Sequence, residues 1–240
     1  MCPDHRQHRG PHPDDMRLFA PEMHSTLRTA TDDLCWLLSR GYALPSALKL
    51  VGDRYQLQER QRTAMARAAC GDKARERRGE RRLVWEAIAG ADLAIDGFNL
   101  LITIEAALGG GLLLDCRDGC VRDLASMHGS YKSVQETEVA LQLIGTALHT
   151  RSEQSPRSVQ WLLDSPVSNS GRLAQRLRDM AATAGWPWQV ETVFNPDAVL
   201  RISDKLVISS DSVILDGNIR WINAAAHLVS QIPDLFRIEI

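Results

Sequence analysis

The chain has 240 residues, 44% of them apolar, and a net charge of −2 from 28 Lys and Arg against 30 Asp and Glu. This length suits one mid-sized domain or a small domain joined to a larger one, and the apolar content excludes global disorder. No apolar run approaches the roughly 20 residues that span a bilayer. The first ten residues lack the apolar core of a secretory signal. Five cysteines, an odd number, are typical of a reducing compartment. We therefore expect a cytoplasmic protein that does not enter a membrane.

The N-terminal third has a helical pattern. Residues 1–15 are rich in Pro, His, Asp and Arg, and we expect them to form a disordered leader. Residues 16–82 predict a small helical domain that ends in a basic linker. Its helical runs are Ala30–Ser39, Pro45–Val51 and about Gln56–Ala69. Such short helices resemble a helix-turn-helix in outline, and a helical cap on the larger domain explains them equally well.

Positive charge is concentrated at the end of this region. Between Arg54 and Arg82 there are ten Lys and Arg against four Asp and Glu. Such a segment is suited to neutralise phosphates of a nucleic acid. A solvated helix face with internal Glu–Arg pairs is the alternative. The apolar content drops over Gly71–Arg82, which makes this segment the best domain boundary.

Residues 83–240 alternate between strand and helix patterns, which predicts an α/β domain with a mainly parallel sheet. Asp115–Cys120 predicts a hairpin turn with Asp118 and Gly119 at its tip, and 235–240 predict a last edge strand. The predicted strands are Leu93–Ile95, Gly111–Asp115, Val159–Leu163, Trp188–Val193 and Leu206–Ser209. The predicted helices are Asn99–Leu108, Val134–His149, Arg172–Ala184 and Ile219–Ser230.

Three of the predicted strands end in a carboxylate: Asp96, Asp164 and Asp211. The carboxyl ends of parallel strands lie along one edge of a sheet, so we expect these side chains to converge. Asp216 follows as a further candidate ligand. Hard oxygen ligands of this kind suit Mg²⁺ or Mn²⁺, and a cation would offset the mutual repulsion of the acids. Each aspartate taken alone is explained as a helix N-cap.

A second group of residues predicts substrate contacts. The polar loop that follows Asp164 leads directly into a helix, where free backbone N–H groups are able to hold a phosphate; ordinary helix capping is compatible with this. The candidate substrate-binding residues are Ser168, Asn169, Ser170, Arg172 and Arg122, with Asn99, Glu105 and Ser210 as supporting residues.

The segment Asp96-Gly97-Phe98-Asn99 at the end of one strand, with Ser209-Ser210-Asp211-Ser212 at another, resembles the PIN-like superfamily. The NYN branch, which opens with Asp-Gly-Tyr/Phe-Asn, is the most similar. The layout is also similar to uncharacterised prokaryotic proteins that pair a short helical segment with such a domain. The resemblance covers residues 90–232 approximately. It implies a three-layer, Rossmann-like fold and a Mg²⁺- or Mn²⁺-dependent ribonuclease in which Asp96, Asp164 and Asp211 match the acidic positions. Many relatives have a second acid where this chain has Val213.

The sequence therefore predicts a metal-dependent nuclease, with RNA as its partner. A non-catalytic PIN-like module that binds RNA or protein is one alternative. Another is a small-molecule phosphohydrolase or nucleotide-binding protein that grips phosphate with the loop Ser168–Gly171. No Gly-rich phosphate loop is present, which weighs against the usual nucleotide cradles. The sequence is also compatible with a homo-oligomer.

Overall fold

The computed structural model describes residues 8–125, 130–150 and 152–240. Over these ranges the chain forms an α/β architecture around a six-stranded sheet of order β1-β8-β7-β2-β5-β6, and all its pairings are parallel. The strands of this main sheet are β1 (Arg82–Leu83), β2 (Asp92–Asp96), β5 (Ser158–Asp164), β6 (Trp188–Val193), β7 (Leu206–Ile208) and β8 (Trp221–Ile222). The prediction of an α/β domain with a mainly parallel sheet is confirmed.

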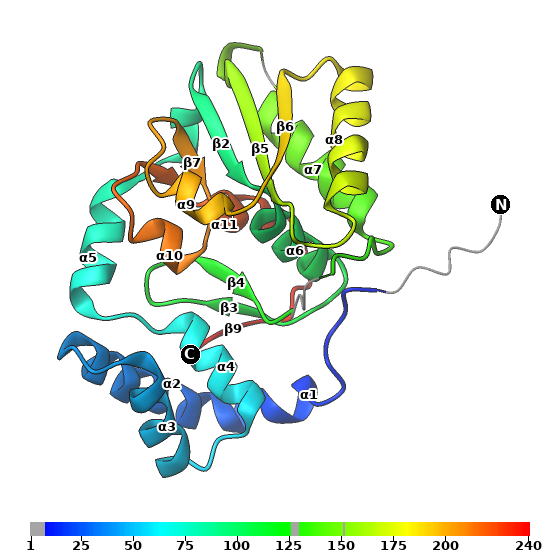
Figure 1. The fold of residues 1–240 in the computed structure, drawn as a ribbon. Coiled ribbons are helices and arrows are strands. Elements are labelled where there is room, and N and C mark those ends of the chain that lie inside the picture. The colour runs from blue at the N-terminus through cyan, green and yellow to red at the C-terminus, as the bar shows by residue number, and fades with distance from the viewer. Residues whose placement is uncertain (1–7, 126–129, 151) are drawn as a thin grey trace.

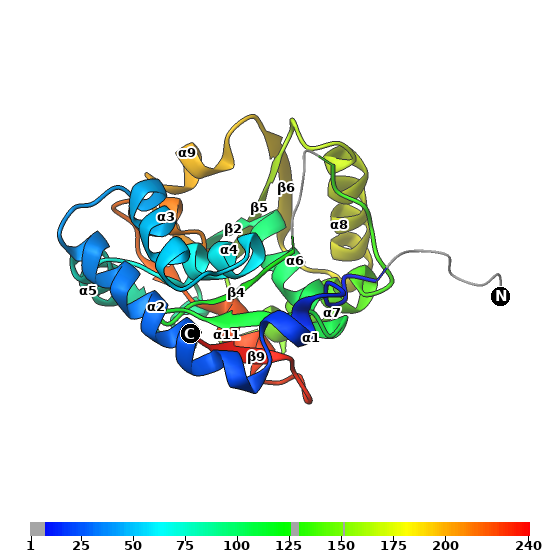
Figure 2. The ribbon, with the colours of Figure 1, turned by 90° about the horizontal axis from the view of Figure 1, so that it is seen from below.

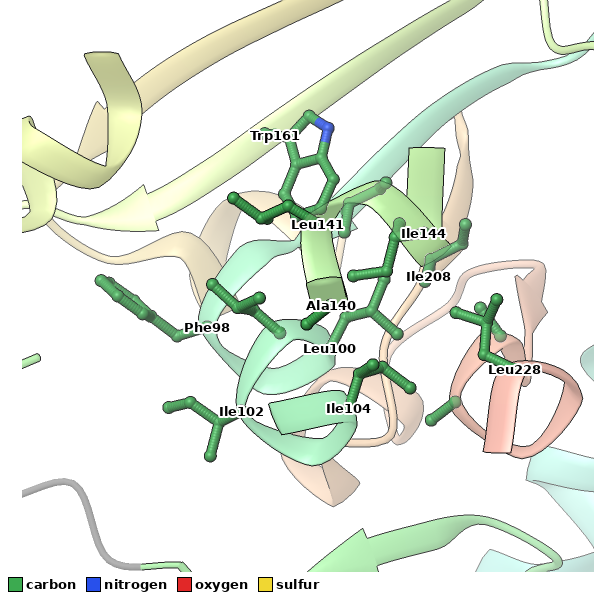
Figure 3. Close-up of a cluster of buried hydrophobic side chains, with 14 of the residues drawn as sticks. Phe98, Leu100, Ile102, Ile104, Ala140, Leu141, Ile144, Trp161, Ile208 and Leu228 are labelled. Carbon is green, nitrogen blue, oxygen red and sulfur yellow. The ribbon is translucent and has the colours of Figure 1, made fainter. Parts of the chain in front are cut away.

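One face of the main sheet packs on four helices: α6 (Gly97–Leu108), α7 (Thr137–His149), α8 (Ser170–Ala184) and α11 (Ala224–Val229). Figure 3 shows part of this core, with side chains from α6, α7 and α11 meeting Trp161 of β5 and Ile208 of β7. Helix α6 is buried on nearly every side, as expected of a helix that is apolar all round. Asn99 is the half-buried exception near its start.

A second sheet lies beside α6. It consists of β3 (Leu113–Asp115), β4 (Val121–Asp123) and β9 (Arg237–Glu239), in the order β4-β3-β9. The predicted hairpin joins β3 and β4, with Gly119 in a left-handed conformation at its tip, φ 79°. The predicted C-terminal edge strand is confirmed as β9, which pairs with β3.

The helical region covers the other face of this small sheet (Figures 1 and 2). Its elements are α1 (Asp15–Leu18), α2 (Pro21–Ser39), α3 (Leu44–Arg54), α4 (Glu59–Ala68) and α5 (Asp72–Arg81). Side chains such as Leu34 and Met65 share one apolar cluster with Leu114 of β3 and Val207 of β7. Residues 16–82 are therefore packed on the α/β domain through a common core, as in the predicted helical cap.

Two predictions in this region differ from the structure. Residues 8–15 of the predicted disordered leader are ordered, because Arg9 reaches the buried Glu105 with an Nε–Oε2 distance of 2.7 Å and Asp15 is fully buried against Arg60. The basic linker is helix α5, and Arg78 on it is only 4% exposed. Sequence composition alone did not show that these arginines pair with acidic residues inside the fold.

Short elements of the α/β domain were also not predicted. Helix α9 (Pro196–Leu200), a 3₁₀ turn η1 (Trp85–Ile88), another turn η2 (Ser152–Gln154) and α10 (Ser212–Leu215) have too few residues to show a periodic pattern. The predicted helix Ile219–Ser230 begins only at Ala224, because Trp221 and Ile222 pair with β1 and β7 instead. Within the described ranges no helix is both long and apolar enough to cross a membrane.

Candidate functional site

Asp96 is the last residue of β2, the strand between β5 and β7. The chain enters helix α6 at once, and Gly97 permits the start of this helix to lie close to β5. A Cβ atom on Gly97 would lie 2.5 Å from Leu163 Cδ2 and 3.0 Å from the Leu162 carbonyl oxygen. A larger residue would push the start of α6 away from β5. The Asp-Gly pair thus places a carboxylate at the strand end with a helix directly behind it.

The topology opens a crevice beside this carboxylate. From β2 the chain proceeds to β5 and β6 on one side, and it then returns to β7 and β8 on the other. Ligands of open α/β sheets bind where connections diverge in this way, beyond the carboxyl ends of the strands. Ser209, Ser210 and Asp211 follow β7 at that point. The structure therefore brings the two sequence motifs together at a topological switch point.

Hydrogen bonds tie the two motifs to each other. Ser209 Oγ donates to Asp96 Oδ2 at 2.8 Å and accepts from the Asp211 backbone N–H at 3.0 Å. Asn99 Oδ1 accepts from both the backbone N–H and the hydroxyl of Ser210, each at 2.9 Å. Asp211 Oδ1 also caps the short helix α10 through the Val213 N–H at 2.7 Å. These contacts between Asn99 and Ser210 fix the loop after β7.

The electrostatics of Asp96 are unusual. Its side chain is nearly buried, with 6% exposed. Burial is the main cause that raises the pKa of this carboxyl to about 8; the negative charges of Asp211 and Asp197 act in the same direction, and the Ser209 hydrogen bond opposes them. Without a cation, Asp96 is therefore largely protonated at neutral pH. A bound divalent cation would favour its ionised form.

Asp164 and Asp197 extend the group of acids. Asp164 ends β5, and burial raises its pKa. Asp197 lies in the first turn of α9, where burial and the charges of Asp211 and Asp164 raise its pKa. We name Asp96, Asp164, Asp197 and Asp211 the acidic edge. Asp197 was not among the candidate ligands that the sequence indicated. Its position four residues after β6 was the signal that this strand end also carries an acid.

Two predicted acids lie elsewhere. The Asp216 carboxylate is held by Arg78 through Nε and Nη2, both at 2.9 Å, and Arg77 is 3.2 Å away. Glu105 is buried against Arg9 and accepts hydrogen bonds from Tyr131 and Thr137 at 2.6 Å each. Both carboxylates already have cationic partners, so the structure does not bring them to the acidic edge.

The predicted substrate-binding residues are also divided. Arg122 is 8% exposed and donates to Asp118, to the Ser210 carbonyl and to the Arg67 carbonyl. Its guanidinium is thereby engaged inside the fold. In the loop after β5, the Ser168 carbonyl accepts from the Tyr131 N–H, and Asn169 Nδ2 donates to the Tyr131 carbonyl. Ser170 is buried, and Arg172 is exposed beside a groove between α7 and α8. These contacts anchor the loop to residues 130–131.

A pocket of about 350 Å³ adjoins the acidic edge. We name it the α4 pocket because helix α4 forms one wall. Its other walls are α6, β4 and the loop after β7. The lining residues are Ala66, Arg67, Ala69, Phe98, Asn99, Ile102, Arg122, Asp123, Ala125, Ser210, Asp211 and Ser212. The helical region thus contributes directly to the cavity beside Asp211.

The acidic edge offers candidate ligands for a metal ion. Across the described ranges, no three His, Cys, Asp or Glu side chains lie close enough together to hold an ion as they stand. The chemistry of the acidic edge nevertheless fits a hard cation. Its ligand atoms are carboxylate oxygens, and the buried Asp96 feels the charges of two further acids. Cys116 and Cys120 are buried, with raised thiol pKa values, and they form no metal site with other residues of the described part of the chain.

Fold and site together define an α/β protein with an acidic edge at its switch point. The chain belongs to the family described as Domain of unknown function (DUF5616), whose model matches residues 85–227. A second model, Protein of unknown function (DUF434), matches residues 26–81. The chain is 29% identical over 198 residues to the uncharacterised protein MJ0935 of Methanocaldococcus jannaschii, a match that covers 82% of this chain and 93% of the relative. No solved structure gives a significant match.

Proposed function

We propose that this protein is a Mg²⁺- or Mn²⁺-dependent ribonuclease of PIN-like type, with its centre at the acidic edge. One observation carries the proposal: the buried carboxyl of Asp96 lies at the switch point of a parallel sheet, within the electrostatic influence of Asp211 and Asp197. Burying acids that repel one another lowers the stability of the fold, and acids with perturbed pKa values of this kind are typical of functional sites. A divalent cation offsets their repulsion and suits the oxygen ligands.

The residues divide the work as follows. Asp96 and Asp211 hold the cation, with Asp164 and Asp197 as further acids along the edge. Ser209 orients Asp96, and Asn99 fixes the backbone of Ser210 next to Asp211. When bound, the cation supplies a water of lowered pKa and stabilises negative charge on the scissile phosphate. The walls of the α4 pocket exclude bulk water from one side of that phosphate.

The test compares two aspartates on the same strand. Asp96→Asn removes a charge at the carboxyl end of β2, and Asp92→Asn removes one at its amino end, where Asp92 pairs with Arg157. With Mn²⁺ present, the wild type and Asp92→Asn are expected to cleave single-stranded RNA, and Asp96→Asn is expected to be inactive. Mn²⁺ at 100 times its Kd should stabilise the wild type by about 2.7 kcal/mol and leave Asp96→Asn nearly unchanged. Equal cleavage by wild type and Asp96→Asn would remove Asp96 from the mechanism.

A small-molecule phosphoesterase is the second candidate. The α4 pocket, about 350 Å³, is at the lower end of the range for small-ligand pockets. This candidate requires the same acids and the same cation. It predicts hydrolysis of mononucleotides or nucleotide esters with no cleavage of polymers, so the two substrate classes assayed side by side separate the candidates.

A further inference from the structure

The α4 pocket contains a guanidinium with spare hydrogen-bonding capacity. Two arginines line the pocket, Arg67 of α4 and Arg122 of β4. Arg122 is 8% exposed, and both ends of its guanidinium are bonded to Asp118. The Arg67 side chain is 34% exposed. Of the two, only Arg67 is open to a ligand in the cavity.

Hydrogen bonds hold the Arg67 guanidinium in place but do not engage all of its N–H donors within the described ranges. Its Nη1 donates to the Asp123 carbonyl oxygen, and its Nη2 donates to the Ala125 carbonyl oxygen at 3.2 Å. Within the described ranges Nε makes no hydrogen bond and the terminal nitrogens make no others, although Nη1 also lies 3.5 Å from Asp123 Oδ1. Two carbonyl contacts on one side therefore fix the fork of the guanidinium and leave donors free, which is how a planar group is pre-organised for an anion.

The charge of Arg67 is only partly offset by the protein. The nearest carboxylate oxygen, Asp123 Oδ1, is 3.5 Å from Arg67 Nη1. Asp123 is itself engaged, because it accepts from Thr103 Oγ1 at 2.9 Å and from the Ala125 N–H at 2.7 Å. Asp211, which lines the same pocket, belongs to the acidic edge. A ligand in this pocket thus meets both a cationic group and one of the acids of that edge.

We propose that Arg67 is a phosphate-binding residue that the helical region contributes to the acidic edge. The ligand is a phosphodiester group bound by the Arg67 guanidinium in the pocket that Asp211 also lines, and Asp211 would hold the cation of the proposed site. The Nδ2 of Asn99 adds a neutral donor, since only Oδ1 of that amide is engaged within the described ranges. This inference rests on the proposed function, because the phosphate is that of the same substrate. It gives the helical region a part in substrate binding.

The experiment measures binding without catalysis. A fluorescein-labelled single-stranded RNA of ten nucleotides is titrated with full-length protein in EDTA, and anisotropy is followed at several salt concentrations. The variants are Arg67→Ala, Arg67→Lys and Arg75→Ala. Arg75 is the matched control, because it is an exposed arginine on the basic helix α5, outside the α4 pocket. Thermal melting of every variant checks that it is folded.

Arg67→Ala is expected to weaken binding about tenfold and to lower the slope of log K against log salt by about 0.7, the value for one contact to a single strand. Arg67→Lys should retain the slope and lose part of the affinity, since lysine keeps the charge without the fork. Arg75→Ala should bind as the wild type does. Equal effects of Arg67→Ala and Arg75→Ala would overturn the proposal and assign binding to the basic helix.

A second variant guards against misfolding of Arg67→Ala. Ala69 is half-buried at the wall of the pocket, so Ala69→Leu narrows the cavity while all charges stay. We expect weaker RNA binding here too, and unchanged binding would contradict occupancy of the pocket. The assay is independent of cleavage: binding that depends on Arg67 together with no Mn²⁺-dependent cleavage would refute the nuclease and keep the phosphate site.

Discussion

Arg78 Nη1 donates to Asp118 Oδ2 at 2.7 Å, and both side chains are almost completely buried. Arg78 comes from helix α5, and Asp118 comes from the β3–β4 turn. Arg122 Nη2 donates to the same Asp118 oxygen at 2.6 Å, and Arg122 Nε donates to the Ser210 carbonyl at 2.8 Å. A chain of buried charges therefore connects the helical region to the loop that carries Asp211.

Asp118→Ala should be strongly destabilising. It leaves two buried guanidinium groups without their shared acid, and removing one partner of a buried ion pair costs about 3–5 kcal/mol. Urea denaturation followed by circular dichroism measures this loss. Asp72→Ala is the control, because Asp72 pairs with Arg117 on the surface, and exposed pairs contribute about 0–1 kcal/mol. Similar losses for the two variants would show that the buried chain is not a major source of stability.

The raised pKa of Asp96 predicts an unusual dependence of the free energy of unfolding on pH. Its folded pKa of about 8 lies above the ordinary value of 3.8, so the folded state binds more protons between these limits. The free energy of unfolding of the metal-free protein should therefore fall as pH rises from about 5 to 8, by a few kcal/mol from this group alone. Denaturation at four pH values in EDTA tests this. Asp96→Asn should flatten the profile, and an identical slope in both proteins would contradict the shift.

Gly97→Ala tests the close approach of α6 to β5. The added Cβ would meet the Leu162 carbonyl oxygen at 3.0 Å as well as the Leu163 side chain, and overpacking of this kind costs about 1–3 kcal/mol. We also expect weaker Mn²⁺ binding, because the start of α6 sets the position of Asp96. Gly171→Ala is a matched control: Gly171 also lies in the first turn of a helix after a strand, and a Cβ there has no neighbour within 4 Å. Its stability should be close to wild type.

Arg9→Ala tests the ordering of the N-terminal segment. The change leaves Glu105 buried without a cation, at 0% side-chain exposure. Burial already raises the pKa of Glu105, so protonation relieves the unpaired charge at low pH. The loss of stability should therefore be greater at pH 8 than at pH 5, reaching about 3 kcal/mol. Arg17→Ala, which breaks an exposed pair with Asp14, should change stability little at either pH.

The strands, and the positions of Asp96 and Asp211 at strand ends, were predictable because their sequence signals are local. Buried runs such as Leu93–Ile95 are short, apolar and bounded by polar residues, and Asp96 and Asp211 follow strands directly. The fate of Asp216 was not predictable. It follows the same strand as Asp211, but its side chain turns to Arg78, which is 138 residues away in sequence. No local pattern encodes such a pairing. The same holds for Glu105 and Arg9.

The α4 pocket could not be predicted for a related reason. Arg67 belongs to a run of basic residues whose composition is uniform, and only tertiary packing separates the arginines that face solvent from those that face other elements. Arg78 is buried, Arg67 faces the cavity, and Arg75 is exposed. Composition therefore predicted contact with phosphates without indicating which of these arginines would make it.

The common core of the helical region and the α/β domain has a consequence for inheritance. The two family matches meet between residues 81 and 85, yet no physical boundary lies there, because Leu34, Met65 and Val207 belong to one cluster. A protein fragment consisting of either part alone would expose this cluster. It would also leave Arg78 or Asp118 without its partner. The matched length of 198 residues in the M. jannaschii relative exceeds residues 83–240, so that match includes both parts. We expect the two parts to be transmitted as one unit, in this order, and not exchanged as separate modules.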